Sequence, residues 1–483
     1  MSWVSKRPIL LGYFNIIVSV IFIINIFNPD LAQAKEISLE EAISWGIEHN
    51  SSLKEIKNNV ESIQRSLDIL ETEYGFKTQI SANPVIAGGF ETDEEEDSSS
   101  TTSTTSPEIK LKTSKLFSNG ISIQSEISLK EEDWFNLEGL TEGAKRSLSV
   151  SKTIYPLIPI EIEQEKYSTS NELVKEQRVL EWQQGVKKID FLETYFSILR
   201  LKEKLVLAQK NFEYAEENLT KVLKSREIGE AGENQEMEAR IALKTAEINL
   251  LEAQNNFQQA KANWYLDLGL NEDEEITLEE KTPFVEELTQ KIESLEVDLD
   301  KDNMERLMDL VISNHYQLKN NLLDQEATQK EIEWQKANKK PRIDLYGAYT
   351  SKNNVWGIGA ELSYNITDGG KQKLEEEGYR VKLENLKEDY QYIIDQLALE
   401  MSRLLNQQKV LELSLEEKII NLQKAQLEKK FYQEQFQRGL ISKTEFQQKL
   451  LIIENAEIDF KSAQDALLIN KLRIFHFLGM SSL

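Results

Sequence analysis

The chain of 483 residues contains no cysteine. This absence excludes disulfide bonds, thiolate metal sites, a cysteine nucleophile and a lipidated N-terminal cysteine. Basic residues are also in the minority, because 57 Lys and Arg stand against 83 Asp and Glu and leave a formal net charge of -26. Nucleic acids and anionic lipid surfaces both require a basic footprint. We therefore expect neither nucleic-acid binding nor docking onto an anionic membrane surface.

Motifs for catalysis are missing as well. The three histidines, His49, His315 and His476, have no partner at metal-ligand spacing. The sequence shows no Ser-His-Asp set, no zinc motif and no Gly-rich phosphate loop. Asp368-Gly369-Gly370 is too short for a nucleotide loop and reads as a turn that enters a helix. We expect no enzyme activity, no metal site and no cofactor.

The first 34 residues have the pattern of a secretory signal peptide. Lys6 and Arg7 form a basic start, an apolar run follows at 9–27, and Ala32-Gln33-Ala34 supplies a cleavage site after Ala34. An uncleaved anchor is the alternative, because the apolar run is just long enough to span a bilayer. No other segment is apolar enough for a transmembrane helix, so a mature membrane protein would have to be a β-barrel.

The sequence matches itself at two fixed offsets, which indicates two copies of one structural unit. At an offset of 210 residues, the string TAEINLLEAQ (Thr245–Gln254) aligns with NAEIDFKSAQ (Asn455–Gln464). At an offset of 265 residues, Leu53 aligns with Leu318. We expect a signal peptide at 1–34, a first repeat at 35–270, an acidic linker or equatorial segment at 271–302 and a second repeat at 303–483.

Each repeat is predicted to begin with a helix, followed by strands, a very long helix, a Gly-containing turn and a shorter helix. The long helices would extend roughly 100 Å at 1.5 Å per residue, which suits a coiled-coil cylinder better than a globular domain. The expected ranges are 38–74 and 303–339 for the first helices, 160–227 and 371–437 for the long helices, and 233–268 and 443–478 for the last helices.

The strands alternate apolar and polar residues with period two, as in Ile343, Leu345 and Tyr349. Two strands in each repeat give four per chain, which cannot close a barrel, so several protomers would have to share one. A trimer would supply twelve strands. The alternating segment Ile109–Lys130 is a possible extra hairpin, and the sequence leaves its place open. The acidic Ser/Thr-rich insert 91–106 is expected to be a solvated loop.

Several segments resemble the TolC-like outer-membrane efflux protein family. They are ISLEEAISWGIEHNSSL (37–53), LSYNITDGGKQK (362–373) and FQRGLISKTEF (436–446). The resemblance implies a mostly α, α+β fold: a homotrimer with a twelve-stranded outer-membrane β-barrel, four strands per chain, and a long antiparallel α-helical coiled-coil tunnel in the periplasm. It implies passive export of small molecules or proteins as the exit duct of a tripartite efflux pump or type I secretion system. The partners would be outer-membrane lipid, a periplasmic adaptor (membrane fusion) protein and an inner-membrane transporter. The alternative is a periplasmic coiled-coil scaffold or spacer that forms no pore.

The same resemblance implies that the turns between long and short helices close the tunnel and meet the adaptor. Ser442 and Glu445 also match a capping box, which would only start a helix, so both roles stay open for Glu445. The pore or gate candidates are Glu445, Gln448, Gln235 and Glu236, and the candidate adaptor contacts are Arg226, Gly229, Gly232, Arg438, Gly439, Leu440 and Ser442.

Overall fold

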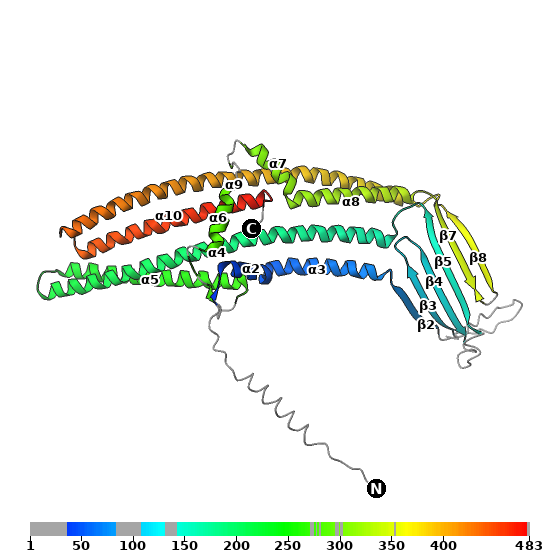
Figure 1. Cartoon of the computed structure of the whole chain (residues 1–483), viewed down its shortest axis with the longest axis horizontal. Helices are drawn as coiled ribbons and strands as arrows, with labels where there is room; N and C mark the ends of the chain where they lie inside the picture. Colours follow the sequence, from blue (N-terminus) through cyan, green and yellow to red (C-terminus); the bar gives the residue numbers. More distant parts are fainter. Residues whose placement is uncertain are drawn as a thin grey trace, which may run out of the picture. The chain divides into compact units, whose positions relative to one another are not determined.

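The computed structural model describes residues 36–83, 108–130, 143–270, 275–276, 278–279, 282–294, 299, 303–351 and 354–480. The expected signal peptide with Ala34, and the acidic insert 91–106, lie outside these residues. The chain forms two compact units: unit 1 comprises Met1–Lys54, Gln183–Glu305 and Met401–Leu483, and unit 2 comprises Glu55–Trp182 and Arg306–Glu400. Two helices of 67 residues each, α4 (Glu161–Glu227) and α9 (Lys371–Gln437), are labelled in Figure 1. Each contributes residues to both units.

Unit 1 is built from helices. It contains α2 (Leu39–His49), α5 (Glu233–Leu268), α6 (Pro283–Ser294), α10 (Lys443–Phe477) and the C-terminal parts of α4 and α9. A small parallel pair joins β1 (Glu36–Ile37) to β6 (Glu275–Ile276), so part of the segment expected as an acidic linker has regular structure. Apolar side chains at helical spacing form the core; fully buried examples are Phe191, Ile198, Trp264, Leu268, Leu472 and Ile474.

Unit 2 combines helices with one sheet. Its helices are α3 (Ser51–Thr72), which starts in unit 1, α7 (Met304–Asn314), α8 (Tyr316–Asn338) and the N-terminal parts of α4 and α9. Its strands are β2 (Phe76–Asn83), β3 (Glu108–Leu116), β4 (Ser122–Lys130), β5 (Lys145–Tyr155), β7 (Arg342–Thr350) and β8 (Val355–Ser363).

The sheet has six strands in the order β2-β3-β4-β5-β7-β8, and every neighbouring pair is antiparallel (Figure 1). The expected four strands per chain are therefore wrong. The segment Ile109–Lys130 forms β3 and β4, which pair along their whole length and lie between β2 and β5. Gly120 makes their tight turn possible because its φ of 79° is a left-handed conformation.

The two faces of the sheet differ in chemistry. Directly paired residues share a face. Successive pairings join one face across all six strands, through Phe76, Lys115, Ile123, Val150, Gly347 and Ile358. That face carries apolar residues on all six strands; they include Phe76, Ile80, Leu111, Ile127, Leu148, Val150, Leu345, Tyr349, Trp356, Ile358 and Leu362. Three basic residues, Lys115, Arg146 and Lys152, lie on the same face. The other face is mostly polar; its members include Lys77, Gln79, Lys112, Glu126, Ser149, Asp344, Glu361 and Ser363.

The first helix of each expected repeat is broken once, which the sequence analysis did not predict. Asn50 separates α2 from α3 with ψ 130°, and His315 separates α7 from α8 with ψ 129°. Each side chain then caps the following helix: Asn50 Oδ1 accepts from the backbone amide of Ser52 (3.1 Å), and His315 Nδ1 accepts from that of Gln317 (3.4 Å). The two breaks are 265 residues apart, the offset found in the sequence.

None of the described helices combines the length and the apolar stretch needed to cross a membrane. Over the same part of the chain, no three His, Asp or Glu side chains are grouped so that they could hold a metal ion.

Candidate functional site

The candidate site consists of the two turns in unit 1 that join the long helices to the shorter ones. Both turns end their helix in the same way: Gly229 and Gly439 adopt φ of 82° and 70°. In the first turn the amide of Gly229 donates to Arg226 O (3.0 Å) and that of Glu230 to Ser225 O (2.8 Å). In the second, Gly439 donates to Phe436 O (3.0 Å) and Leu440 to Gln435 O (2.9 Å). These are Schellman motifs, which satisfy carbonyls left open at a helix end.

The first turn is held by an ionic cluster. Glu236 is buried, with 7% of its surface exposed, and lies between two arginines. Arg226 forms an ion pair with it across the turn, and Arg240 binds it from the next turn of α5 at 2.7 Å. The neighbouring Gln235 is exposed and accepts a hydrogen bond from the backbone amide of Gly232 (3.0 Å). Glu236 and Gln235 are the two pore candidates in this turn. The negative charge of Glu236 is compensated by two arginines, and the side chain of Gln235 caps the helix.

The second turn is held by an aromatic pair. The rings of Phe436 and Phe446 stack at a centroid distance of 5.0 Å with 6° between their planes. Ser442 begins α10, and its Oγ accepts from the backbone amide of Glu445 (3.1 Å). This bond needs no Glu445 side chain, so the exposed carboxylate is left available for another role.

The remaining predicted residues of the second turn face solvent. Leu440 is 68% exposed, and Gln448 is also exposed. Arg438 is exposed and approaches Glu434 at 3.8 Å, a pair too open to add much stability. The turn therefore presents a cation and an apolar side chain next to each other, a combination suited to protein contact.

A ladder of ion pairs ties the two turns together through α4 and α10. Arg200 contacts Asp465 (2.8 Å), Lys461 contacts Glu203 (2.8 Å) and Lys210 contacts Glu454 (2.8 Å). Nearest the turns, Lys443 contacts Glu217 (3.1 Å) and Lys221 donates to Thr444 Oγ1 (3.2 Å). Hydrogen bonds from Lys443 and Lys221 hold the pKa of Glu217 below its usual value. The antiparallel ladder fixes the alignment of α4 against α10.

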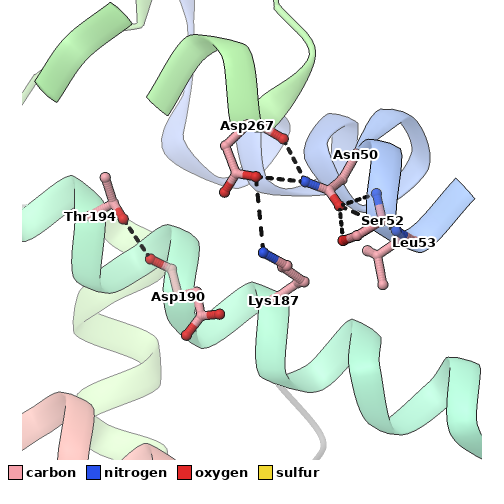
Figure 2. Close-up of polar contacts among 7 residues, drawn as sticks. All are labelled: Asn50, Ser52, Leu53, Lys187, Asp190, Thr194 and Asp267. Carbon is pink, nitrogen blue, oxygen red and sulfur yellow. Dashed lines mark hydrogen bonds and ion pairs between the residues drawn. The ribbon is translucent and has the colours of Figure 1, made fainter. Parts of the chain in front are cut away.

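A second polar cluster in unit 1 surrounds Asn50 (Figure 2). Its Nδ2 donates to both the backbone oxygen and Oδ1 of Asp267 at 2.8 Å, so the break between α2 and α3 is joined to the end of α5. Lys187 of α4 approaches Asp267 Oδ1 at 3.9 Å. On the same helix, burial raises the pKa of Asp190 above its usual value. The cluster is a structural junction of four helices, α2, α3, α4 and α5.

The sequence located both turns but missed what stabilises them. The Arg226–Glu236 and Phe436–Phe446 pairs each join residues ten apart in the chain across a turn, a spacing that neither helix nor strand periodicity reveals. The repeat offset of 210 residues could have indicated these pairs, because it aligns Arg226 with Phe436 and Glu236 with Phe446. The two pairs thus occupy equivalent positions.

Comparisons with known proteins find no match to the sequence among protein-family models or curated proteins. The fold does match solved structures. CusC, described in connection with transmembrane channel formation, matches with a TM-score of 0.61 and 12% identity over 91% of this chain and 92% of that chain. The Campylobacter jejuni CmeC outer membrane channel gives 0.61 and 13% over 91% and 85%. The open Neisseria gonorrhoeae MtrE outer membrane channel gives 0.60 and 12% over 91% and 88%. The mostly helical fold with a small antiparallel sheet is shared with these solved channel structures, in agreement with the mostly α, α+β fold class that the resemblance implied.

Proposed function

We propose that the chain is one protomer of an outer-membrane exit channel, in which three copies share one barrel and one helical tunnel. One observation carries the proposal: a single sheet has one mostly apolar face and one mostly polar face, within a fold shared over about nine-tenths of the chain with solved outer-membrane channels. The apolar face would meet lipid, and the polar face would line a water-filled lumen.

The helices suit the rest of such a duct. Each 67-residue helix has a length of roughly 100 Å at 1.5 Å per residue, enough to extend far beyond a membrane. Charged residues on their surfaces form ion pairs such as Lys210–Glu454 and Lys443–Glu217. Such surfaces tolerate water on the outside and in a lumen, so the helices would form the periplasmic tunnel. The matching helix lengths in the two halves support the internal repeat.

The two turns would form the periplasmic end of the duct. Glu445 is the acid we assign to the pore, since its side chain is exposed and its helix is capped without it. Three copies would place three such carboxylates around one axis, which favours cations at the opening. Arg438 and Leu440 would contact a periplasmic adaptor protein that links the duct to an inner-membrane transporter. The cargo would be selected by that transporter.

The experiment is cell fractionation followed by single-channel recording. The full-length protein, extracted in detergent from the outer-membrane fraction, is expected to be a trimer and to conduct ions in a planar bilayer. A water-soluble periplasmic species that gives no conductance would contradict the channel and support the scaffold instead. If the trimers insert into the bilayer but do not conduct, the variant Arg226→Ala tests whether they are closed channels. This substitution removes the ion pair of Arg226 with Glu236 that holds the first turn, so the conductance should rise.

A further inference from the structure

The two outer strands of the sheet, β2 and β8, present open edges. Among the described residues, β2 pairs only with β3 and β8 only with β7. The side chains near these edges are unusually exposed for their size: Phe76 is 76% exposed, Ile80 73%, Trp356 73% and Ile358 80%. Exposed apolar edge strands bind other strands readily, and proteins normally cover or charge them. We therefore expect each edge to pair with a strand of another chain.

The two edges match each other in direction and in face. All five pairings in the sheet are antiparallel, so with six strands β2 and β8 run in opposite directions. The apolar residues of β2 and those of β8 also lie on the same face of the sheet, as the chain of paired residues shows. A second copy can thus place its β8 beside β2, continue the antiparallel order and keep the apolar face unbroken.

Side-chain chemistry selects one register for that pairing. A shift of one residue would turn the apolar residues of one strand onto the polar face of the other. Among registers that keep the faces, one sets Lys77 of β2 opposite Glu361 of β8, and a shift of two residues separates this pair. Lys77 contacts Glu73 within the chain but is half-exposed, and Glu361 is exposed. The same register aligns apolar partners along the other face; they are Phe76–Leu362, Ile80–Ile358 and Ala82–Trp356, with Thr78 opposite Ala360.

We propose that β2 of one copy pairs with β8 of a second copy of this chain in the register that opposes Lys77 and Glu361. This inference rests on the proposed channel function. Three copies of six strands then give a ring of eighteen strands instead of the twelve expected from the resemblance. Barrel diameter grows roughly linearly with strand number, so the ring would be about 1.5 times as wide. The additional hairpin β3–β4 is thereby the element that sets the width of the outer opening.

Disulfide cross-linking tests the register directly, because the natural chain has no cysteine to interfere. The full-length variant Thr78→Cys/Ala360→Cys, oxidised in outer membranes, should form covalent trimers. The control variants Phe76→Cys/Ala360→Cys and Ile80→Cys/Ala360→Cys place the second thiol two residues away. Diagonal neighbours are about 7–8 Å apart, beyond the usual reach of a disulfide, so their cross-linking should be several-fold lower. Efficient cross-linking of a shifted pair, or of none, would overturn the register.

A charge exchange gives independent evidence. Lys77→Glu should lower the temperature at which the oligomer dissociates, and Glu361→Lys in the same chain should restore it. If the double variant dissociates as early as the single variant, the two residues are not opposed.

Two further measurements separate this inference from the channel itself. Electron microscopy of the unmodified particle should show eighteen strands, and a ring of twelve with β3 and β4 outside it would overturn the proposal. Conductance and oligomeric size of the unmodified protein test the channel. A conducting trimer without the predicted cross-link would refute only the strand pairing, whereas a non-conducting monomer would refute both.

Discussion

Arg226 forms an ion pair with Glu236 across the turn between α4 and α5. At the equivalent positions of the turn between α9 and α10, Phe436 stacks on Phe446. The two turns share a backbone geometry, since Gly229 and Gly439 both adopt positive φ. One turn is therefore closed by charge and the other by ring contact. Salt screens partly exposed charges and leaves ring stacking unaffected, so high ionic strength should weaken the first turn more than the second.

Replacing Glu236 by Gln should loosen the first turn. The change removes the buried carboxylate that Arg226 and Arg240 share, at a cost of about 1 kcal/mol. Hydrogen exchange of the amides at 228–236 should become faster. Glu247→Gln is the matched control on α5, because Lys244, the ion-pair partner of Glu247, is 74% exposed. In this control, the hydrogen exchange of the amides at 228–236 should not change. Equal protection of 228–236 in both variants would show that the cluster does not stabilise the turn.

Replacing Asn50 by Ala should destabilise the junction of α2, α3 and α5. Asn50 is 2% exposed, and its oxygen accepts from the amides of Ser52 and Leu53 while its nitrogen binds Asp267. Loss of a helix cap and of buried hydrogen bonds should cost about 2 kcal/mol, measured by denaturant unfolding. Asn50→Asp keeps the acceptor but faces Asp267 with a second carboxylate, so it should recover only part of the loss. Full recovery would mean that the bond to Asp267 contributes nothing.

Two glycine-to-alanine substitutions within helices should have opposite effects. A Cβ on Gly46 would lie 2.5 Å from Leu268 Cδ2 and 2.8 Å from Phe191 Cε2, so Gly46→Ala should cost about 1–3 kcal/mol. A Cβ on Gly378 would meet nothing within 4 Å, and Gly378→Ala should stabilise α9 by about 0.5–1 kcal/mol. Thermal unfolding of both variants measures the difference. A stabilising Gly46→Ala would contradict the close packing of α2, and a destabilising Gly378→Ala would contradict the open surroundings of that residue.

Acid should remove a contribution made by Glu376. Hydrogen bonds from Lys339 and Arg380 lower its pKa from 4.5 to about 2. The folded state therefore gains stability that is fully present above pH 4.5 and is lost as the pH falls toward about 2. Glu376→Gln should be less stable than the natural chain at neutral pH, and the gap should narrow across this window. Glu375→Gln, whose partner Lys371 is 76% exposed, should show a small difference that varies little with pH. A gap in the Glu376 variant that stays constant with pH would refute the assignment.

Replacing Glu445 by Gln should change conductance without changing stability. The Ser442 cap uses only the backbone amide of Glu445, so unfolding should shift by less than about 0.5 kcal/mol. Single-channel recordings should show lower cation selectivity and weaker block by divalent cations. Ser442→Ala is the converse control, because it removes the cap at a cost of about 1 kcal/mol and keeps the charge. Unchanged traces for Glu445→Gln would leave the residue with no role in the pore.

Local features of the sequence determined much of the fold. The expected long helices differ from α4 and α9 by no more than one residue at an end, because a glycine ends each helix and the helical pattern before it is uninterrupted. The expected shared face of Ile343, Leu345 and Tyr349 on β7 is also confirmed, since alternation with period two requires only that one side of a strand be apolar. These features depend on residues a few positions apart.

Tertiary structure alone decided the features that join distant residues. The sequence of β3 and β4 alternates as any exposed hairpin would, and only pairing with β2 and β5 made it part of a six-stranded sheet. The side chain of Asn50 at the helix break binds Asp267, which is 217 positions away in the sequence. No local sequence pattern could therefore predict this contact. The partner of Glu236 was hidden for the same reason, because a turn brings Arg226 back to it. Periodicity reports which side of an element is apolar, whereas pairing partners are chosen by contacts that only the folded chain creates.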